Sequence, residues 1–229
     1  MQQTVWNTAF AQRPDMFGSA PSEPAQEAAA LFERARHNTV LELGGGQGRD
    51  TIWFASQGLS VTVLDYAPSA IAAIGAKAAA RGLSDRVRAL CHDVRTRLPL
   101  DDALFDCCYS HMLFSMALTG RELERLAAEI CRVLKPGGLH VYTVRHTGDP
   151  HYRQGIHTGE DMYDVGGFIV HFFDRSRVRQ LAAGFDVLDV HEFEEGPLPR
   201  RLFRVTLRKS TVVNANPASE EVCNESSHW

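Results

Sequence analysis

The sequence predicts an α/β fold, built on a mainly parallel sheet that helices cover on both faces. From about residue 39, short apolar runs alternate with helical patterns, as in successive strand–helix–strand units. The first apolar run leads directly into a glycine-rich loop, and open sheets of this class bind ligands at the carboxyl ends of their strands. A length of 229 residues suits one large domain, or one domain with a small appendage.

Each element has its own signal in the sequence. The expected strands are rich in β-branched and aliphatic residues, and the expected helices carry alanines or an apolar stripe and end near glycines such as Gly58 and Gly82. A Lys-Pro-Gly-Gly turn is expected at residues 135–138. We expect strands at residues 39–44, 60–65, 87–93, 105–112 and 139–144, and helices at residues 50–57, 69–81 and 121–134.

The regular pattern stops at residues 147–174, which hold glycines, histidines and tyrosines. A long loop in a compact domain is usually functional, so we interpret this segment as a loop beside the ligand site. A helix is then expected at residues 176–183, followed by a hairpin of two strands at 185–192 and 201–208. The polar residues 211–229 predict a disordered tail.

The first 38 residues form a segment of their own. Trp6, Phe10, Met16 and Phe17 are large apolar residues among polar residues and prolines, and a helix is expected at residues 25–35. We interpret residues 1–38 as an N-terminal cap on the top of the sheet. The main domain then spans residues 39–210.

The composition argues against several classes of function. The 24 basic and 28 acidic side chains give a net charge of −4, which is unfavourable for a nucleic-acid partner. No run of about 18 apolar residues predicts a membrane-spanning helix, and no secretory signal is visible. Five cysteines without a CxxC pair favour a reducing, cytoplasmic location. His151 and His157 lack the companions of a metal site, so no metal is expected.

The glycine loop after the first strand narrows the choice of ligand. A dinucleotide fingerprint, G-x-G-x-x-G, requires a glycine at the position of Arg49. The spacing that fits is E-x-G-x-G-x-G, formed by Glu42, Gly44, Gly46 and Gly48. Glycines after a strand also occur in simple turns, so the loop alone does not identify a cofactor.

This spacing resembles motif I of the class I S-adenosylmethionine-dependent methyltransferases, and four further matches follow in order. Asp65 ends the second strand, His92-Asp93-Val94 ends the third, Phe105-Asp106 opens the fourth, and residues 134–138 match the family's turn before the fifth. The resemblance covers about residues 35–146. Each match also has a structural explanation, since Asp65, for example, suits a helix cap ahead of Pro68.

The resemblance implies a seven-stranded doubly wound sheet in the order 3-2-1-4-5-7-6, with strand 7 antiparallel, and S-adenosylmethionine as the cofactor. It places Asp65 on the ribose hydroxyls and Asp93 opposite the adenine amino group. The residues expected to bind the cofactor are Glu42, Gly44, Gly46, Gly48, Asp65, Tyr66, Asp93, Val94 and Ser110.

The end of the fourth strand bears on the methyl acceptor. Family members that methylate nucleic-acid bases often carry (N/D)-P-P-(Y/F) there, whereas this chain has Tyr-Ser-His-Met at residues 109–112. We therefore expect a small-molecule acceptor, with residues 147–174 as an acceptor-side loop. His111, His146 and Tyr163 are the candidate catalytic residues.

Two other functions stay open at this point. An RNA or protein methyltransferase would show an extended basic groove, and a non-catalytic, cofactor-binding regulatory subunit would lack a lined acceptor pocket. The acceptor atom is also open among oxygen, nitrogen, sulfur and a metalloid.

Overall fold

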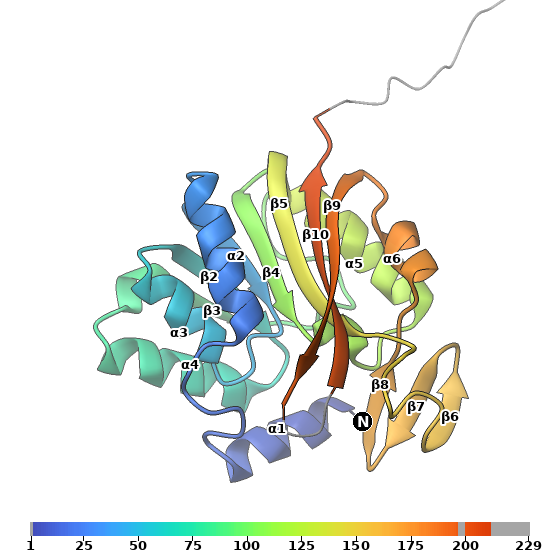
Figure 1. Cartoon of the computed structure of the whole chain (residues 1–229). Helices are drawn as coiled ribbons and strands as arrows, with labels where there is room; N and C mark the ends of the chain where they lie inside the picture. Colours follow the sequence, from blue (N-terminus) through green and yellow to red (C-terminus); the bar gives the residue numbers. More distant parts are fainter. Residues whose placement is uncertain (1, 197–199, 212–229) are drawn as a thin grey trace, which may run out of the picture.

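The computed structural model describes residues 2–196 and 200–211, which fold around a seven-stranded sheet (Figure 1). The strand order is β3-β2-β1-β4-β5-β10-β9, and β10 is antiparallel to both β5 and β9. The predicted order is confirmed, because β9 and β10 are the sixth and seventh strands of this sheet. The strands are β1 (Thr39–Leu43), β2 (Ser60–Asp65), β3 (Val87–Cys91), β4 (Phe105–His111), β5 (Leu134–Arg145), β9 (Phe185–Glu195) and β10 (Arg200–Lys209).

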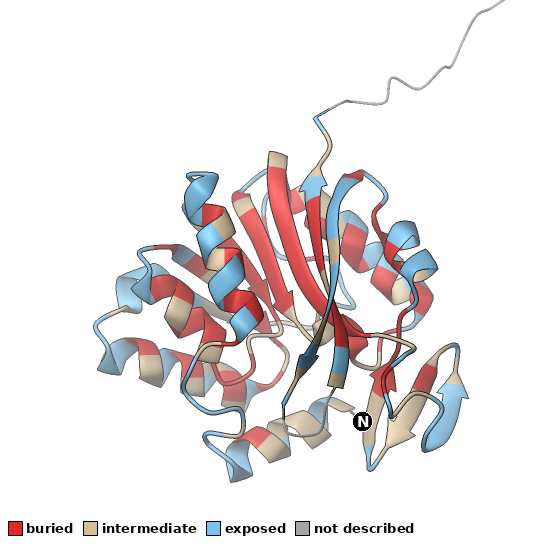
Figure 2. Ribbon diagram, in the orientation of Figure 1, coloured by how far each residue is buried: buried red, intermediate tan, exposed pale blue. Residues whose placement is uncertain are grey.

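Two layers of helices enclose this sheet because successive side chains of a strand point to opposite faces. In β1, Val40 packs with one apolar cluster, whereas Leu41 and Leu43 pack with the cluster on the other face. Figure 2 shows the central strands as a buried band between the helices. The first layer holds α2 (Glu23–Arg34), α3 (Arg49–Ser56) and α4 (Pro68–Ala80), and the second holds α5 (Gly120–Val133) and α6 (Arg175–Leu181).

The structure corrects two local expectations and adds one helix. Residues 147–174 are not a loop: they contain β6 (Ile156–Gly159), β7 (Met162–Val165) and β8 (Phe168–His171), a separate antiparallel sheet whose four-residue strands are too short to show clear alternation. The expected turn at residues 135–138 belongs to β5, which pairs with β4 from Leu134 onward across a register shift. The first residues form a helix, α1 (Gln2–Gln12), which has no regular apolar stripe.

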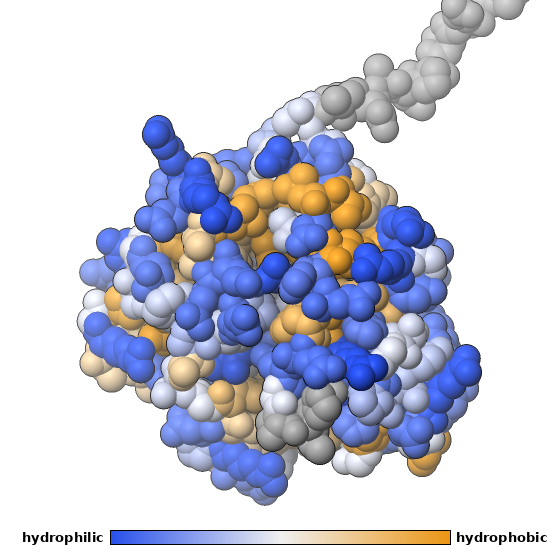
Figure 3. All heavy atoms as spheres, viewed as in Figure 1, coloured by the Kyte–Doolittle hydropathy of each residue, from blue (hydrophilic) through white to orange (hydrophobic). Residues whose placement is uncertain are grey.

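The end of the sheet where β1 and β2 terminate is covered by α1. Figure 1 shows α1 below the sheet and next to the small β6-β7-β8 sheet, and it contacts α4 and β8. The surface, seen from the same side and coloured by hydropathy, is mainly hydrophilic, with apolar side chains gathered over the upper part of β5 and β10 (Figure 3). Among the described helices, none has the length and apolar character needed to cross a membrane. The expected tail lies outside the described residues from 212 onward.

Candidate active site

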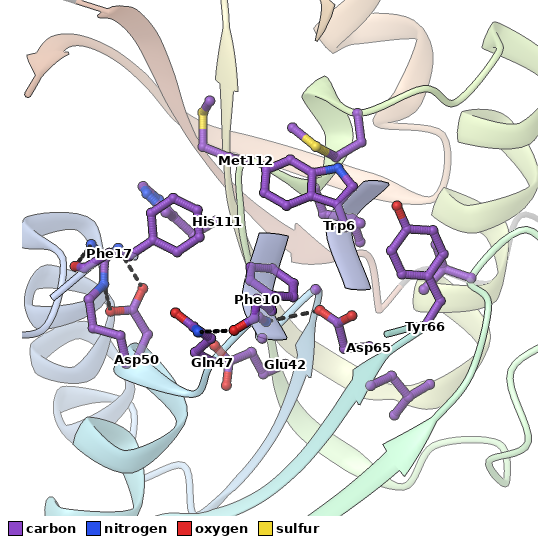
Figure 4. Close-up of a pocket in the computed structure, with 18 of the residues that line it drawn as sticks. Trp6, Phe10, Phe17, Glu42, Gln47, Asp50, Asp65, Tyr66, His111 and Met112 are labelled. Carbon is purple, nitrogen blue, oxygen red and sulfur yellow. Dashed lines mark hydrogen bonds and ion pairs between the residues drawn. The ribbon is translucent and has the colours of Figure 1, made fainter. Parts of the chain in front are cut away.

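A cavity of about 420 Å³ opens at the carboxyl ends of β1, β2 and β4, beneath α1 (Figure 4). This volume falls in the range of about 300–1,000 Å³ that is usual for small-molecule sites. Its floor is the glycine loop between β1 and α3. The cavity therefore lies where open α/β sheets bind their ligands.

The glycine loop is packed too closely to accept side chains. A Cβ atom at Gly45 would lie 2.3 Å from Cγ2 of Val63, which is far inside van der Waals contact. Gly46 has a φ of +53°, a conformation that favours glycine, and a side chain there would project toward the ring of Phe10 on α1. A Cβ atom at Gly46 would lie 3.6 Å from Cζ of Phe10, so α1 lies directly over the loop at this point.

Asp65 links this loop to the end of β2. Its Oδ2 accepts the N–H of Gly46 at 2.9 Å, and its Oδ1 accepts the N–H of Ala67 at 2.9 Å. Burial raises the pKa of Asp65, and the backbone donors oppose that rise. Each carboxylate oxygen has a second acceptor site, so Asp65 can still accept hydrogen bonds from a ligand in the cavity.

Glu42 lies under the loop, at the bottom of the cavity. Burial and the nearby charge of Asp50 raise the pKa of Glu42 to about 8, although the hydroxyl of Thr51 donates a hydrogen bond to its carboxyl group. A positive ligand at this position would favour the ionised carboxylate. The floor can therefore gain a negative charge when a cation binds.

Residues after β3 form one end of the cavity. His92, Asp93, Val94 and Arg95 line it there, together with Tyr66. Arg95 holds the carboxylate of Asp93 through a 2.6 Å Nη2–Oδ2 contact, and this hydrogen bond lowers the pKa of Asp93. Burial raises the pKa of Tyr66 to about 12, so its hydroxyl keeps its proton at neutral pH.

The roof of the cavity is α1 and the turn after it, and Gln47 of the glycine loop fastens this roof. The Nε2 of Gln47 donates to the carbonyl groups of Phe10 (3.1 Å) and Arg13 (2.7 Å), and its Oε1 accepts the N–H of Met16 (3.0 Å). Figure 4 shows the Gln47 amide directed at Phe10, with Asp65 close by. Gln3 adds a 2.7 Å hydrogen bond to the carbonyl of Tyr66.

The other end of the cavity holds His111, Glu195 and several apolar side chains. The Nε2 of His111 lies 3.3 Å from Oε1 of Glu195, and its Nδ1 lies 2.9 Å from the hydroxyl of Thr143. Met112 follows β4 with a φ of +66°, an uncommon conformation for a residue with a side chain. Figure 4 shows Phe17 and Met112 on either side of His111, with Trp6 nearby. Met116 completes this wall.

The structure brings most of the predicted site residues into one cavity. Those that line it are Glu42, Gly44, Gly46, Asp65, Tyr66, Asp93, Val94 and His111. Gly48 lies behind the loop, where a Cβ atom would be 2.7 Å from Cγ1 of Ile74. Ser110 is fully buried, and its register partner Tyr142 packs on the α5 side of the sheet.

Two of the three candidate catalytic residues lie away from the cavity. His146 stacks on Phe203 with ring centroids 4.6 Å apart, and Tyr163 of β7 packs on Tyr152 and His157. Conversely, sequence reasoning missed Gln47 and Glu195. The position of Gln47 inside motif I was a usable signal, whereas nothing in the sequence near Glu195 indicates that it faces His111. Across residues 2–196 and 200–211, no group of three or more His, Cys, Asp or Glu side chains is arranged to hold a metal ion.

Comparisons with known proteins agree with this fold. Residues 40–138 match the model of a methyltransferase domain. A sterol 4-C-methyltransferase of Caenorhabditis elegans is 33% identical over 122 residues, which are 53% of this chain and 35% of that protein. Phosphoethanolamine N-methyltransferase 1 of Triticum aestivum is 32% identical over 121 residues, which are 52% of this chain and 24% of that protein. The match thus spans about a quarter to a third of these curated relatives.

Solved structures share the fold over nearly the whole chain. The CcbJ methyltransferase of Streptomyces caelestis has a TM-score of 0.71 at 18% identity, covering 91% of this chain and 99% of that one. A 1,6-didemethyltoxoflavin-N1-methyltransferase of Burkholderia thailandensis, solved with S-adenosylhomocysteine, has a TM-score of 0.70 at 20% identity, covering 91% and 87%. The motifs in register and the order of the sheet agree with the match of residues 40–138 to a methyltransferase domain.

Proposed function

We propose that this protein transfers a methyl group from S-adenosylmethionine to a small-molecule acceptor and releases S-adenosylhomocysteine. One observation carries the proposal: a single roofed cavity joins the motif residues around Asp65 to a second, differently lined end around His111. A cofactor and an acceptor need such adjoining places, because the enzyme accelerates the reaction mainly by holding the two reactants in line.

The residues around the glycine loop fit the cofactor. Asp65 would accept the ribose hydroxyls with its remaining acceptor sites, and Asp93 and Tyr66 would lie along the adenosine. The loop around Gly46 offers the space next to the amino-acid part, with Glu42 below it. When bound, S-adenosylmethionine supplies an electrophilic methyl group on a positively charged sulfur. Gly48 and Ser110 would then support the loop and β4 from behind.

The chain contributes orientation and exclusion of water. Helix α1 covers the cavity through neutral hydrogen bonds from Gln47 and Gln3, so the roof can close over a ligand without adding charge. Closing a site in this way strengthens the electrostatic interactions inside it. His111, at the far end, is placed to act on the acceptor, whereas His146 and Tyr163 would act on it only from outside the cavity wall.

A small acceptor is supported by the lining of the cavity. Three aromatic rings, those of Trp6, Phe10 and Phe17, lie within 6.4 Å of one another between centroids and enclose apolar space. The names of the two curated relatives, a sterol and a phosphoethanolamine methyltransferase, also refer to small acceptors. A lined acceptor end argues against a purely regulatory subunit. The free cysteines, including the exposed Cys91, support a reducing compartment such as the cytoplasm.

The test is calorimetric titration of S-adenosylhomocysteine into wild-type, Asp65→Asn and Asp101→Asn proteins. Asp65→Asn replaces a carboxylate oxygen by an amide donor that faces backbone N–H groups, and a hydrogen bond to a charged group contributes about 1.5–3 kcal/mol. We expect affinity to fall about 10- to 100-fold in this variant and to stay unchanged in the exposed control Asp101→Asn. Equal affinity in all three proteins, or binding of NADH in place of S-adenosylhomocysteine, would overturn the proposal.

A further inference from the structure

Glu195 is an acidic residue at the acceptor end of the cavity for which the cofactor-binding motifs provide no role. It is the last residue of β9, and the antiparallel insertion of β10 brings that end of β9 beside the end of β4. Its carboxylate lines the cavity and contacts His111. Glu195 therefore faces the space where the acceptor would lie.

The hydrogen bonds around His111 determine which ring nitrogen carries the proton. The hydroxyl oxygen of Thr143 accepts the N–H of Met112 at 3.0 Å and lies 2.9 Å from Nδ1 of His111. Thr143 is fully buried and has a single hydroxyl proton. Within the described part of the chain, the acceptor that this hydroxyl reaches is Nδ1 of His111, so Thr143 donates its proton to that nitrogen. Nε2 of neutral His111 therefore carries the ring proton and donates it toward Glu195. His111 positions the carboxylate and is not itself the free base.

Glu195 remains a carboxylate at neutral pH. Burial alone would raise the pKa of Glu195, but the hydrogen bond from His111, the charge of His111 in its protonated form and the positive charges of Arg49 and Arg200 hold that pKa below its ordinary value. Arg49 is itself paired with Asp50, so part of its charge is already compensated. A carboxylate of low pKa is poorly matched to remove a proton from a phenol or a thiol, because efficient general bases have pKa values near the operating pH.

The same carboxylate is well suited to a nitrogen nucleophile. A neutral amine attacks with its lone pair and needs no prior deprotonation, and its nitrogen becomes positive as the new bond forms. A fixed negative charge next to that nitrogen stabilises the charge that develops in the transition state. The surrounding rings of Trp6, Phe10 and Phe17 and the thioether of Met112 favour a flat, apolar framework for the amine.

We propose that Glu195 is a catalytic residue on the acceptor side, and that the acceptor is a neutral amine on a flat ring whose N–H donates a hydrogen bond to Glu195. The nitrogen lone pair forms the new N–CH₃ bond while the S–CH₃ bond breaks and sulfur keeps its electron pair. Positive charge moves from sulfur to nitrogen, and the N–H proton leaves through Glu195 to water. The proposal rests on the proposed methyl transfer and adds to it the class of acceptor.

The experiment compares matched probes on one ring. Aniline, 2-naphthylamine and 3-aminoquinoline are each paired with the phenol and the thiol of the same ring. Binding to the complex with S-adenosylhomocysteine is measured by calorimetry, and methylated products are measured by mass spectrometry. We expect at least one amine to bind and to be methylated at least tenfold faster than its phenol or thiol. Preference for a phenol or a thiol, or no binding of any amine, would overturn the proposal.

Variants of two adjacent glutamates test the contribution of the Glu195 carboxylate. Glu195→Gln should lower the affinity and methylation rate of the amine at least tenfold and leave the affinity for S-adenosylhomocysteine within twofold. Glu194→Gln is the matched control, because Glu194 is exposed and pairs with Arg201. Unchanged amine methylation in Glu195→Gln would contradict the role of Glu195. Failure of wild-type protein to bind S-adenosylhomocysteine would instead contradict the proposed function itself.

The positioning role of His111 has a separate readout. His111→Gln keeps an N–H donor for Glu195, whereas His111→Phe removes it, and loss of the donor raises the pKa of Glu195. In His111→Phe, the acidic limb of the pH profile for amine methylation should shift to higher pH, and in His111→Gln it should stay close to wild type. The same profile in all three proteins would show that His111 acts only as a structural residue.

Discussion

Removing the side-chain amide of Gln47 should loosen the roof of the cavity. Gln47 is almost fully buried, and its amide makes three hydrogen bonds to the backbone of Phe10, Arg13 and Met16. A neutral hydrogen bond contributes about 1 kcal/mol net, so Gln47→Ala removes about 3 kcal/mol from the closed position of α1. Since 1.4 kcal/mol is tenfold in an equilibrium constant, the closed-to-open ratio falls by about two orders of magnitude.

This loss should appear in both motion and binding. When a ligand binds only the closed form, its apparent affinity falls with the fraction that is closed. We expect hydrogen exchange of the α1 amides to become about 10- to 100-fold faster in Gln47→Ala, and the dissociation constant of S-adenosylhomocysteine to rise by up to the same factor. Mass-spectrometric hydrogen exchange and titration calorimetry measure the two effects.

The matched control is Gln57→Ala, because Gln57 is exposed and its amide donates to the adjacent hydroxyl of Ser56. This control should match wild-type protein in both assays. Wild-type protection of α1 in Gln47→Ala would refute the reasoning, since it would mean that the three hydrogen bonds do not hold the roof.

Two further predictions concern the glycine loop and its floor. Gly45→Ala places a Cβ atom 2.3 Å from Val63 and should lower the free energy of unfolding by about 1–3 kcal/mol, whereas Gly75→Ala, with open space inside helix α4, should raise it by up to about 1 kcal/mol. Urea unfolding measures both, and equal stabilities would contradict the close packing of the loop. The pKa of Glu42 is raised from 4.5 to about 8, so its contribution to stability is full below pH 4.5 and is lost as the pH rises to about 8. Between pH 5 and 8, wild-type protein should therefore lose more unfolding free energy than Glu42→Gln, by at most about 1.4 kcal/mol per pH unit. Urea unfolding at several pH values measures this difference. If the unfolding free energies of the two proteins change in parallel over this range, Glu42 is not buried in its neutral form.

The fold was predictable because its signals are local. Alternating apolar runs mark β1 to β5, and the apolar stripe of residues 121–134 marks α5, whose buried residues follow that stripe. The small β6-β7-β8 sheet was missed because four-residue strands between turns carry too few residues for a periodic pattern. The helix α1 was missed for another reason: its apolar residues do not repeat at helical spacing, and its contacts are made with distant elements such as α4 and β8.

The two ends of the cavity differ in the same way. The end around Asp65 is built from residues within or just after consecutive strands, so the spacing around Gly46 and the positions of Asp65 and Asp93 were readable in the sequence. The end around His111 is built from three strands that only the folded sheet brings together. His111 was found because it ends β4. Thr143 becomes its neighbour because β4 pairs with β5, and Glu195 because β10, the last strand in the sequence, inserts between β5 and β9.

The contacts at the beginning of α1 bear on how the protein is prepared for assay. Gln2 donates a hydrogen bond to the carbonyl of Gly167, and Trp6 packs on the ring of Phe168, so the start of this helix sits against the small sheet. A substitution at Gln2 or Trp6 would weaken this docking and loosen the first turn of α1 from the small sheet. Any residues added near this contact in a recombinant protein should therefore be identical in wild-type protein and in every variant that is compared.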